Sequence, residues 1–390
     1  MRLQRPMPMR IEGEWINAPE TQAVCAMLTG AGYQALFVGG CVRNALLQAP
    51  VADIDISTDA LPDEVMRLAQ AAGLKAVPTG IEHGTVTVVS GSIPHEVTTF
   101  RRDVESHGRH ATVAFSTDVT EDARRRDFTM NALYADATGR VIDPLGGLED
   151  LVARKVRFIE EPAARIKEDY LRILRFFRFF AWYGDPENGI DPEGLAACAA
   201  HTDGLARLSR ERVGSELLKL LAAKTPVQSV ASMRQAGVLM TVLEGADDKA
   251  LGPLVHFETE WHLPPDPIRR LAALGGENLQ EALRLSKVQA RRLDKLRGAI
   301  GSGQGLGELA YREDAAFALD AALLRAAVFE LPVPENASED IAKGAEAVFP
   351  ISAEDLDGLT GRALGDRLKA LEYQWIASGF TATRVALLEG

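Results

Sequence analysis

Apolar residues in the first hundred positions of the chain follow two different periods. Residues 20–32 (ETQAVCAMLTGAG) and 61–73 (LPDEVMRLAQAAG) space their apolar residues as helices that end at glycine. Residues 34–40 (QALFVGG), 51–58 (VADIDIST) and 84–100 (GTVTVVSGSIPHEVTTF) have the short apolar runs and the alternation of strands, with a turn at 91–94. This part of the chain is therefore predicted to be α/β or α+β with a small sheet.

Beyond residue 124 the β-rich runs largely stop and the helical period takes over. Helices are predicted at residues 163–183, 209–224, 226–235, 267–274 and 288–300. Residues 301–310 and 330–338 are the best loop candidates. We therefore expect an α+β protein in which a small mixed-sheet head is followed by an all-α remainder.

Composition narrows the class of protein. The 390 residues are 46% hydrophobic and 25% charged, which is ordinary for a globular chain. No run approaches the roughly 20 apolar residues that cross a bilayer, and the N-terminal residues lack the apolar core of a signal peptide. The expected location is the cytoplasm, with no membrane partner. Cys25, Cys41 and Cys198 are widely spaced, so neither a zinc site nor a disulfide-linked partner is expected.

The net charge of −12 argues against an indiscriminate nucleic-acid coat protein, because phosphate binding depends on Lys and Arg. The charge is unevenly distributed, however. Residues 154–178 contain eight Lys or Arg and four acids. Such a local excess of positive charge indicates either a bounded polyanion site or a solvated helix face.

Asp53 and Asp55 interrupt an otherwise apolar strand pattern. Because strand side chains alternate between faces, both carboxylates project from the same side. Two such groups repel each other and are costly to bury, so a divalent cation such as Mg²⁺ is the natural compensation. The alternative is an exposed edge strand that carries two solvated acids.

The neighbouring sequence favours the metal site. Gly39 and Gly40 lie at a predicted strand-to-helix turn, where backbone N–H groups can approach a phosphate, and Arg43 adds a cation. Glu96 on another predicted strand could bring a third carboxylate to the pair. Metal-binding acids beside an anion site are what two-metal nucleotidyl transfer needs.

The ordered set of motifs resembles the class II tRNA nucleotidyltransferase and bacterial poly(A) polymerase family, within the polymerase β superfamily. The motifs cover residues 35–221 and read, in order, GGCVR, DID, EVTTFRRD, RRDFTMNAL, DPLGGLEDL, EDYLRILRFFRF and LSRERVGSELLKLL. The resemblance implies a nucleotidyltransferase catalytic head at residues 1–150 and a helical nucleobase-binding neck at 151–224. A helical, tRNA-binding body and tail would occupy 225–390.

The resemblance also implies roles for individual residues of the head. Asp53 and Asp55 match the metal-binding pair, with Glu96 as a third catalytic acid. The triphosphate-binding turn is matched by Gly39, Gly40 and Arg43. The motif that holds ribose and phosphates is matched by Arg126, Asp127 and Asn131. The hinge between head and neck is matched by Asp143, Gly146 and Gly147. A charge cluster at a helix N-terminus is the alternative for the motif that holds ribose and phosphates.

The motif EDYLR bears on base selection. Asp169 and Arg172 are three residues apart, hence expected on one helix face, and offer an acceptor and a fork of donors to a base edge. The resemblance implies that they replace a nucleic-acid template, that Arg175 and Arg178 extend this nucleotide-binding face, and that Glu211 and Arg212 brace it. In isolation, an ordinary surface ion pair would look the same.

Two positions depart from the family pattern: Asn44 follows Arg43 where aspartate is usual, and Tyr170 stands where proline is usual. Residues 79–89 (TGIEHGTVTVV) resemble CCA-adding enzymes, because poly(A) polymerases carry a basic stretch there. The segment 100–118 is full length, whereas enzymes that add only CC tend to be shortened.

We therefore expect Mg²⁺-dependent addition of CCA to tRNA 3′ ends from CTP and ATP. The alternatives are a poly(A) polymerase, a non-catalytic relative that only binds RNA, and an adenylyltransferase that acts on a small molecule or a protein.

Overall fold

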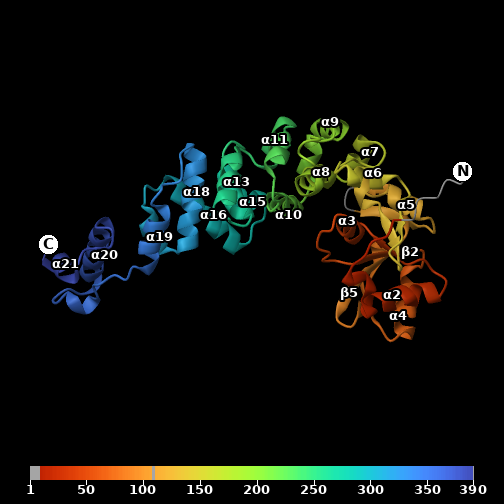
Figure 1. Ribbon diagram of the computed structural model, residues 1–390, viewed down its shortest axis with the longest axis horizontal. Helices are drawn as coiled ribbons and strands as arrows, with labels where there is room; N and C mark the ends of the chain where they lie inside the picture. Colours follow the sequence, from red (N-terminus) through yellow and green to blue (C-terminus); the bar gives the residue numbers. More distant parts are fainter. Residues whose placement is uncertain (1–8, 108–109, 390) are drawn as a thin grey trace, which may run out of the picture. The chain divides into compact units, whose positions relative to one another are not determined.

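The computed structural model describes residues 9–107 and 110–389 and has two compact units. The first lies within Met1–Arg212 and Gln235–Thr241, and the second within Val213–Arg234 and Val242–Gly390 (Figure 1). The division into head, neck, and body with tail expected from the sequence stays a prediction. In the described part of the chain, no helix has the length and apolar character needed to cross a membrane.

The first unit contains a seven-stranded mixed sheet with the strand order β3-β4-β5-β2-β1-β8-β9. Its strands are β1 (Leu36–Val38), β2 (Asp55–Thr58), β3 (Lys75–Gly80), β4 (Thr85–Ser90), β5 (Ile93–Thr99), β8 (Tyr134–Asp136) and β9 (Val141–Ile142). Only β2 and β5 pair in parallel; the other neighbours are antiparallel. A separate two-stranded ribbon consists of β6 (Arg101–His107) and β7 (His110–Phe115).

Two helices cover the sheet near β4. Helix α2 (Pro19–Gly30) and helix α4 (Pro62–Ala71) each begin with proline in the first turn, where its missing N–H removes no helical hydrogen bond. They pack on each other and on β4, whose residues alternate between buried and half-buried (Figure 1). The helices predicted at 20–32 and 61–73 and the strands predicted at 34–40 and 84–100 are therefore confirmed, and with them the α+β class. The strand predicted at 51–58 begins only at Asp55, so Asp53 lies outside it.

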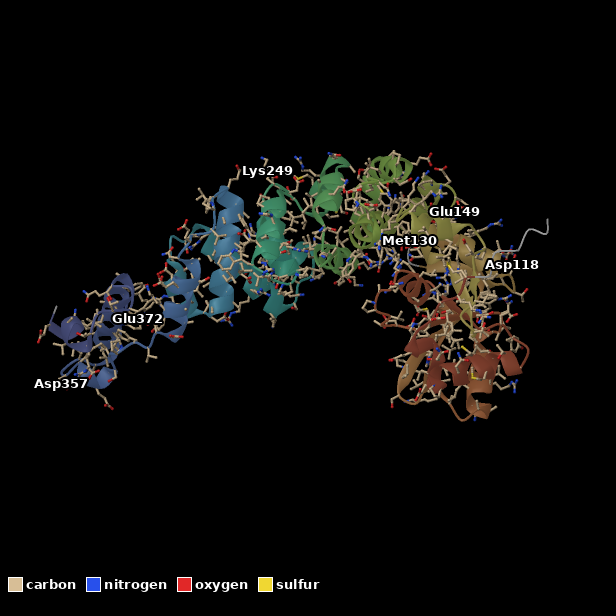
Figure 2. All side chains as sticks on the ribbon, viewed as in Figure 1. Asp118, Met130, Glu149, Lys249, Asp357 and Glu372 are labelled. Carbon is tan, nitrogen blue, oxygen red and sulfur yellow. The ribbon has the colours of Figure 1, made fainter. Side chains whose placement is uncertain are left out.

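Short helices complete the first unit. They are α1 (Glu14–Asn17), α3 (Gly40–Leu46), η1 (Ile81–His83), α5 (Val119–Arg124), η2 (Thr129–Asn131), α6 (Gly147–Val152), α7 (Pro162–Glu168), α8 (Leu171–Tyr183), α9 (Pro192–Ala200), η3 (Thr202–Arg207) and the first residues of α10 (Arg210–Leu221). Helix α12 (Val238–Val242) also falls largely in this unit. Helix α5 begins at the cap Asp118 (Figure 2), whose carboxylate accepts a hydrogen bond from Thr120 N at 2.8 Å.

Two expectations for this unit were wrong. The helix predicted at residues 163–183 is broken, because α7 ends at Glu168 and Asp169 has extended backbone angles of φ −151° and ψ 107°. Strands also continue beyond residue 124, since β8 pairs with β1 along its whole length. Both exceptions lie close to the residues of the candidate site.

The second unit is built from helices. They are the rest of α10, α11 (Val227–Gln235), α13 (Leu251–Glu260), α14 (Pro267–Leu274), α15 (Leu279–Ala282), α16 (Lys287–Gly301), α17 (Leu306–Arg312), α18 (Ala315–Phe329), α19 (Ala337–Glu346), η4 (Ala353–Asp355), α20 (Gly361–Ala377) and α21 (Arg384–Glu389). The helices predicted at 209–224, 226–235, 267–274 and 288–300 are confirmed as α10, α11, α14 and α16. Between α17 and α20, the Tyr311 hydroxyl donates to Glu372 at 2.8 Å (Figure 2).

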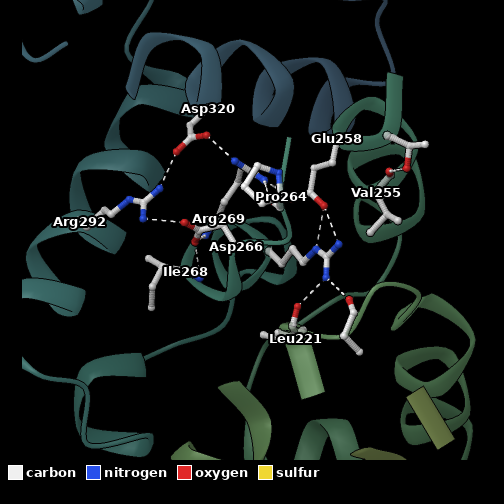
Figure 3. Close-up of polar contacts among 12 residues, drawn as sticks. Leu221, Val255, Glu258, Pro264, Asp266, Ile268, Arg269, Arg292 and Asp320 are labelled. Atoms are coloured by element: carbon white, nitrogen blue, oxygen red, sulfur yellow. Dashed lines mark hydrogen bonds and ion pairs between the residues drawn. The ribbon is translucent and has the colours of Figure 1, made fainter. Parts of the chain in front are cut away.

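Buried charges join four helices of the second unit (Figure 3). Glu258 of α13 is 2% exposed and accepts hydrogen bonds from Arg269 and Arg270 of α14 at 2.8 and 2.9 Å. Arg269 also donates to Asp320 of α18 at 2.6 Å, and Arg292 of α16 donates to the other oxygen of Asp320 at 2.7 Å. Because each of these charges has a charged partner, the helices are held in one register.

The three cysteines are buried and free. Burial raises the pKa of Cys25 to about 12 and that of Cys41 to about 11, and it raises the pKa of Cys198 as well.

Candidate active site

Three carboxylates line one cavity of the first unit. Asp55 opens β2, and Glu96 of β5 is its register partner across the parallel pair, with Glu96 N donating to Ile54 O at 3.2 Å. Asp53 precedes the strand and is exposed. All three side chains line a cavity of about 350 Å³ together with residues that include Thr87. The sequence prediction that Glu96 joins the aspartate pair is therefore confirmed as a matter of position.

Burial and neighbouring negative charges disfavour ionisation of the Asp55 carboxyl group. Its burial, together with the charges of Glu96 and Asp53, raises its pKa to about 6, while Arg126 opposes the rise. A buried carboxylate beside like charges is the donor set that a hard divalent cation relieves. The described residues hold no set of three or more acidic, His or Cys side chains that would bind a metal unaided. An ion held by Asp53 and Asp55 would therefore complete its coordination with water and substrate oxygens.

The turn before α3 brings backbone and an arginine close together. Gly39 adopts φ 69°, which favours glycine, and its N–H donates to Leu133 O at 3.2 Å. A Cβ atom at Gly39 would lie 3.5 Å from Arg126 Nη1. Arg126 in turn donates to Asp122 at 3.0 Å and to the Tyr134 hydroxyl at 3.1 Å, so the turn lies against a fixed guanidinium.

Arg126 is part of a buried pair. Burial would raise the pKa of Asp122, but Arg126 and Arg125 outweigh burial and hold that pKa well below its ordinary value. The same carboxylate, together with Tyr134, raises the pKa of Arg126. Arg126 therefore stays charged, and its charge acts on the Asp55 carboxyl group.

A chain of hydrogen bonds connects α3 to α8 through the RRDFTMN segment. Arg43 is 6% exposed and donates through Nη1 to Asn131 Oδ1 at 2.5 Å. The Asn131 amide donates to Asp127 Oδ1 at 2.8 Å, and Asp127 Oδ2 accepts from Arg175 Nε at 2.7 Å. Burial would raise the pKa of Asp127, but Arg175 and Asn131 lower it to about 2. The structure thus brings together four residues that sequence analysis had assigned to three separate motifs.

Three arginines surround one aromatic ring of α8. The guanidinium carbons of Arg43, Arg175 and Arg178 lie 5.1, 5.2 and 4.7 Å from the centroid of Phe179. Within this group, Asp127 forms an ion pair with Arg175. Such a concentration of guanidinium groups on rigid elements suits a substrate with several phosphates.

The EDYLR residues are both engaged within the protein. Asp169 Oδ2 accepts from Arg212 Nη2 at 2.6 Å, and its Oδ1 accepts from Leu171 N at 3.1 Å. Arg172 donates to Glu168 Oε2 at 2.5 Å and to Arg125 O at 2.8 Å. The expectation that Asp169 and Arg172 share one helix face is wrong, because Asp169 precedes α8. Arg172 still lies within one turn of Arg175 on α8, so the pair stays close to the phosphate-binding candidates along the chain.

Comparisons with known proteins agree with this geometry. Residues 35–157 match the family model of the poly A polymerase head domain, and residues 189–249 match that of the probable RNA and SrmB-binding site of polymerase A. The chain is 33% identical over 380 residues to the CCA-adding enzyme of Geobacillus thermodenitrificans (strain NG80-2), covering 94% of this chain and 92% of that protein. This chain belongs to the CCA-adding nucleotidyltransferase family.

Other members of the CCA-adding family agree in sequence and in fold. The human mitochondrial CCA tRNA nucleotidyltransferase 1 is 38% identical over 57% of this chain and 50% of its own length. The crystal structure of the Bacillus stearothermophilus CCA-adding enzyme in complex with CTP is 27% identical, covers 92% of each chain and superposes with a TM-score of 0.74. The Thermotoga maritima CCA-adding enzyme complexed with tRNA has a TM-score of 0.71 at 18% identity, which shows the shared fold.

Both departures from the CCA-adding family pattern have structural partners. Asn44 Oδ1 accepts from Arg43 Nη2 at 2.9 Å, and its amide donates to Pro50 O at 2.8 Å. The ring of Tyr170 packs against Gly204, where a Cβ atom would come within 1.9 Å of the ring. Position 44 therefore supports Arg43 without a charge, and position 170 contributes to packing beside Asp169.

Three further residues support the site through hydrogen bonds to nearby elements. Asp143 accepts from the N–H groups of Gly147 and Leu148, at 2.9 Å each, and so caps α6; its role as a hinge stays a prediction. Asp150 of α6 accepts from the Thr129 hydroxyl at 2.6 Å, which fixes the turn that carries Asn131. Tyr183 contacts Arg43 from the end of α8. Asp143 and Asp150 lie in the motif DPLGGLEDL, whereas no motif marks Tyr183, whose partner Arg43 is 140 residues away.

Proposed function

We propose that this chain adds CCA to the 3′ ends of tRNA, using CTP and ATP and with Mg²⁺ as the cofactor. The observation that carries the proposal is the cavity lined by Asp53, Asp55 and Glu96, in the same compact unit as the three arginines around Phe179. The match to CCA-adding enzymes over nearly the whole chain supports the choice of substrates. The residues that would act lie within one compact unit.

The carboxylates would hold the metal and orient the reacting groups. Asp53 and Asp55 are the proposed ligands, and Glu96 would stabilise the site as the third acid. When bound, Mg²⁺ supplies activation of the tRNA 3′-hydroxyl and neutralises charge on the transferred phosphorus. Binding requires Asp55 to be ionised, and Arg126 favours that state by its charge.

The arginine group would bind the triphosphate. The Gly39–Gly40 turn offers backbone close to Arg126, while Arg43, Arg175 and Arg178 converge on Phe179. Asp127 and Asn131 would hold Arg43 and Arg175 at a fixed separation and contribute to binding the ribose. Because these contacts involve phosphate and sugar, they would serve CTP and ATP alike.

Base selection would fall to Asp169 and Arg172. Their donor and acceptor atoms already have partners in Arg212 and Glu168, so a base edge would have to share or displace these contacts. Two nucleotides of different size can be read by one pair of side chains if those side chains can exchange partners. We therefore propose that the Asp169–Arg212 and Arg172–Glu168 pairs hold the two side chains ready until a base arrives.

The remaining assignments follow the same proposal. Residues 1–150 would form the catalytic head, 151–224 the nucleobase-binding neck, and 225–390 the body and tail that bind tRNA through backbone contacts. The cytoplasm is the proposed location.

The test is incubation of the protein with tRNA that lacks its terminal CCA, with labelled CTP and ATP supplied separately and together. CTP alone should extend the tRNA by two residues, and both nucleotides together by three and no further. A poly(A) polymerase would instead build long tails from ATP alone, an RNA-binding relative would incorporate nothing, and an adenylyltransferase would label a different molecule. The double variant Asp53→Asn with Asp55→Asn, which keeps the side-chain size, is the inactive control.

A further inference from the structure

The buried guanidinium of Arg43 is held entirely by neutral groups. Asn44 Oδ1 accepts from Nε at 3.2 Å and from Nη2 at 2.9 Å, Asn131 Oδ1 accepts from Nη1 at 2.5 Å, and the Tyr183 hydroxyl accepts from Nη2 at 2.8 Å. Among the residues that the structure describes, no carboxylate forms an ion pair with Arg43; Asp127 reaches it only through Asn131. Every nitrogen of the guanidinium therefore has a partner, while its charge has none in direct contact.

Tyr183 contributes two kinds of contact. Its ring lies beneath the guanidinium, with the Arg43 Cζ atom 4.0 Å from the ring centroid, and its hydroxyl bonds Nη2. The stacking fixes the plane of the guanidinium, and the hydrogen bond fixes its rotation within that plane. Tyr183 is the last residue of α8, so it ties the helix that carries Arg175 to the turn that carries Gly39 and Gly40.

Because the hydrogen-bond partners of Arg43 are all neutral, each of them is needed to hold the guanidinium in place. A carboxylate can hold a guanidinium through two parallel hydrogen bonds between opposite charges, which fixes it more firmly than single hydrogen bonds to neutral oxygens do. Burial already disfavours the charged form of Arg43, and Arg178 and Arg175, which also lie near the Phe179 ring, repel it. Without Tyr183, two amide oxygens alone would have to hold Arg43 against this repulsion.

We propose that Tyr183 is a positioning residue for nucleotide binding, which holds the uncompensated charge of Arg43 in the orientation that meets the triphosphate. This inference rests on the proposed role of Arg43 and deepens it. It predicts that Tyr183 affects the binding of the nucleotide phosphates and affects neither recognition of the base nor binding of the tRNA. A carboxylate at position 44 would pair with the guanidinium directly and make Tyr183 dispensable.

The experiment uses the full-length protein and tripolyphosphate, a probe that has the phosphates without sugar or base. Its dissociation constant is measured by calorimetry, beside the KM values for CTP, ATP and tRNA. Tyr183→Phe keeps the ring and removes one hydrogen bond, so it should weaken tripolyphosphate binding and raise both nucleotide KM values by the same factor, roughly threefold to tenfold. Tyr183→Leu removes the stacking as well and should have a larger effect. Tyr33→Phe, the same change at a half-buried tyrosine of the same unit, should have none.

The decisive variant is the double change Asn44→Asp with Tyr183→Phe, compared with each single change. Recovery of tripolyphosphate binding in the double variant supports positioning through Arg43, because a merely structural defect at Tyr183 would not be repaired by a charge on α3. Unchanged tripolyphosphate binding in Tyr183→Phe, or a loss confined to one nucleotide or to tRNA, would overturn the proposal. Should Tyr183→Leu not fold, the Phe variant and its rescue decide the question. Because calorimetry needs no turnover, failure of CCA addition would be recognised separately.

Discussion

Asp55 and Glu96 are paired across the parallel strands β2 and β5, and this pairing contributes to a carboxyl pKa near neutrality for Asp55. Parallel pairing places the two residues on the same face of neighbouring strands, so their charges meet inside one cavity. A protein gains nothing in stability from such an arrangement, which makes it an indicator of function.

In the absence of metal, Asp55 should make stability fall as pH rises. Its pKa lies at about 6 in the folded protein against an ordinary 3.8, so the folded state binds the proton more tightly. The free-energy cost of ionising Asp55 in the folded protein is absent below pH 3.8, grows between pH 3.8 and 6, and is complete above pH 6. In urea unfolding with EDTA, the free energy of unfolding of Asp55→Asn should therefore increase relative to that of the wild type as the pH rises, by at most about 3 kcal/mol. A pH-independent difference would contradict the assignment.

Addition of Mg²⁺ at pH 7.5 should reverse this penalty. The thermal midpoint of the wild type should rise on titration, while that of Asp53→Asn or Asp55→Asn should rise much less, because each lacks one charged ligand. Nucleotide incorporation by either variant should be abolished. Asp63→Asn, at an exposed position in the first turn of α4, is the matched control. Substantial turnover by either site variant with Mg²⁺ would rule out the metal assignment.

Asp127→Asn should weaken the use of CTP and ATP equally. The substitution removes the carboxylate that pairs with Arg175 at 2.7 Å and so lets the arginine group spread. Stability should fall by about 1–3 kcal/mol at neutral pH, because a hydrogen-bonded charge pair is lost. Measuring KM for each nucleotide beside the urea midpoint checks both parts. A loss for one nucleotide alone would move Asp127 into the group that reads the base.

Arg172→Ala should erode discrimination among the four nucleoside triphosphates and leave tRNA affinity nearly unchanged. Losing one good bidentate contact to a base is worth roughly 1–3 kcal/mol, or about tenfold to a hundredfold in selectivity. The measurement is kcat/KM for CTP, ATP, UTP and GTP, with a salt series of tRNA affinity. Arg165→Ala is the control, since Arg165 also contacts Glu168 and a backbone carbonyl. Unchanged nucleotide ratios with a smaller salt slope would show that Arg172 binds the RNA backbone.

Glu258→Gln should destabilise the second unit without changing nucleotide KM. Glu258 accepts from Arg269 and Arg270 in a buried site. Removing its charge takes away the carboxylate that pairs with Arg270, while Arg269 keeps Asp320, and breaking such a buried pair costs about 3–5 kcal/mol. Differential scanning calorimetry should show the loss. Glu260→Gln, at an exposed position two residues along the same helix, should behave like the wild type. Equal midpoints for the two variants would mean that the cluster shown in Figure 3 adds little to stability.

Sequence analysis succeeded where the signal is local. The alternation around Ile54 and Ile56 and the apolar period of α16 are properties of neighbouring residues, and the corresponding elements are present. Sequence analysis also anticipated that Glu96 could join the aspartate pair, because Asp55 and Glu96 were expected on two strands of one small sheet, and these strands do pair.

It failed where distant partners decide the structure. Asp169 leaves the helical conformation with its carboxylate bonded to Arg212, which is 43 residues away, and no local period records that contact. The strand β8 is three buried residues long, too short for a period to be recognised, and it forms because β1 offers a free edge. The link between Arg43 and Tyr183 spans 140 residues.

The buried cysteines have a practical consequence. A thiol reacts as its thiolate, and burial keeps Cys25, Cys41 and Cys198 protonated at neutral pH and out of reach of reagents. A cysteine introduced at an exposed position could thus be coupled to a fluorophore by maleimide chemistry without first replacing the natural ones. Dyes placed on each compact unit would then report on movement between the units during the addition of successive nucleotides.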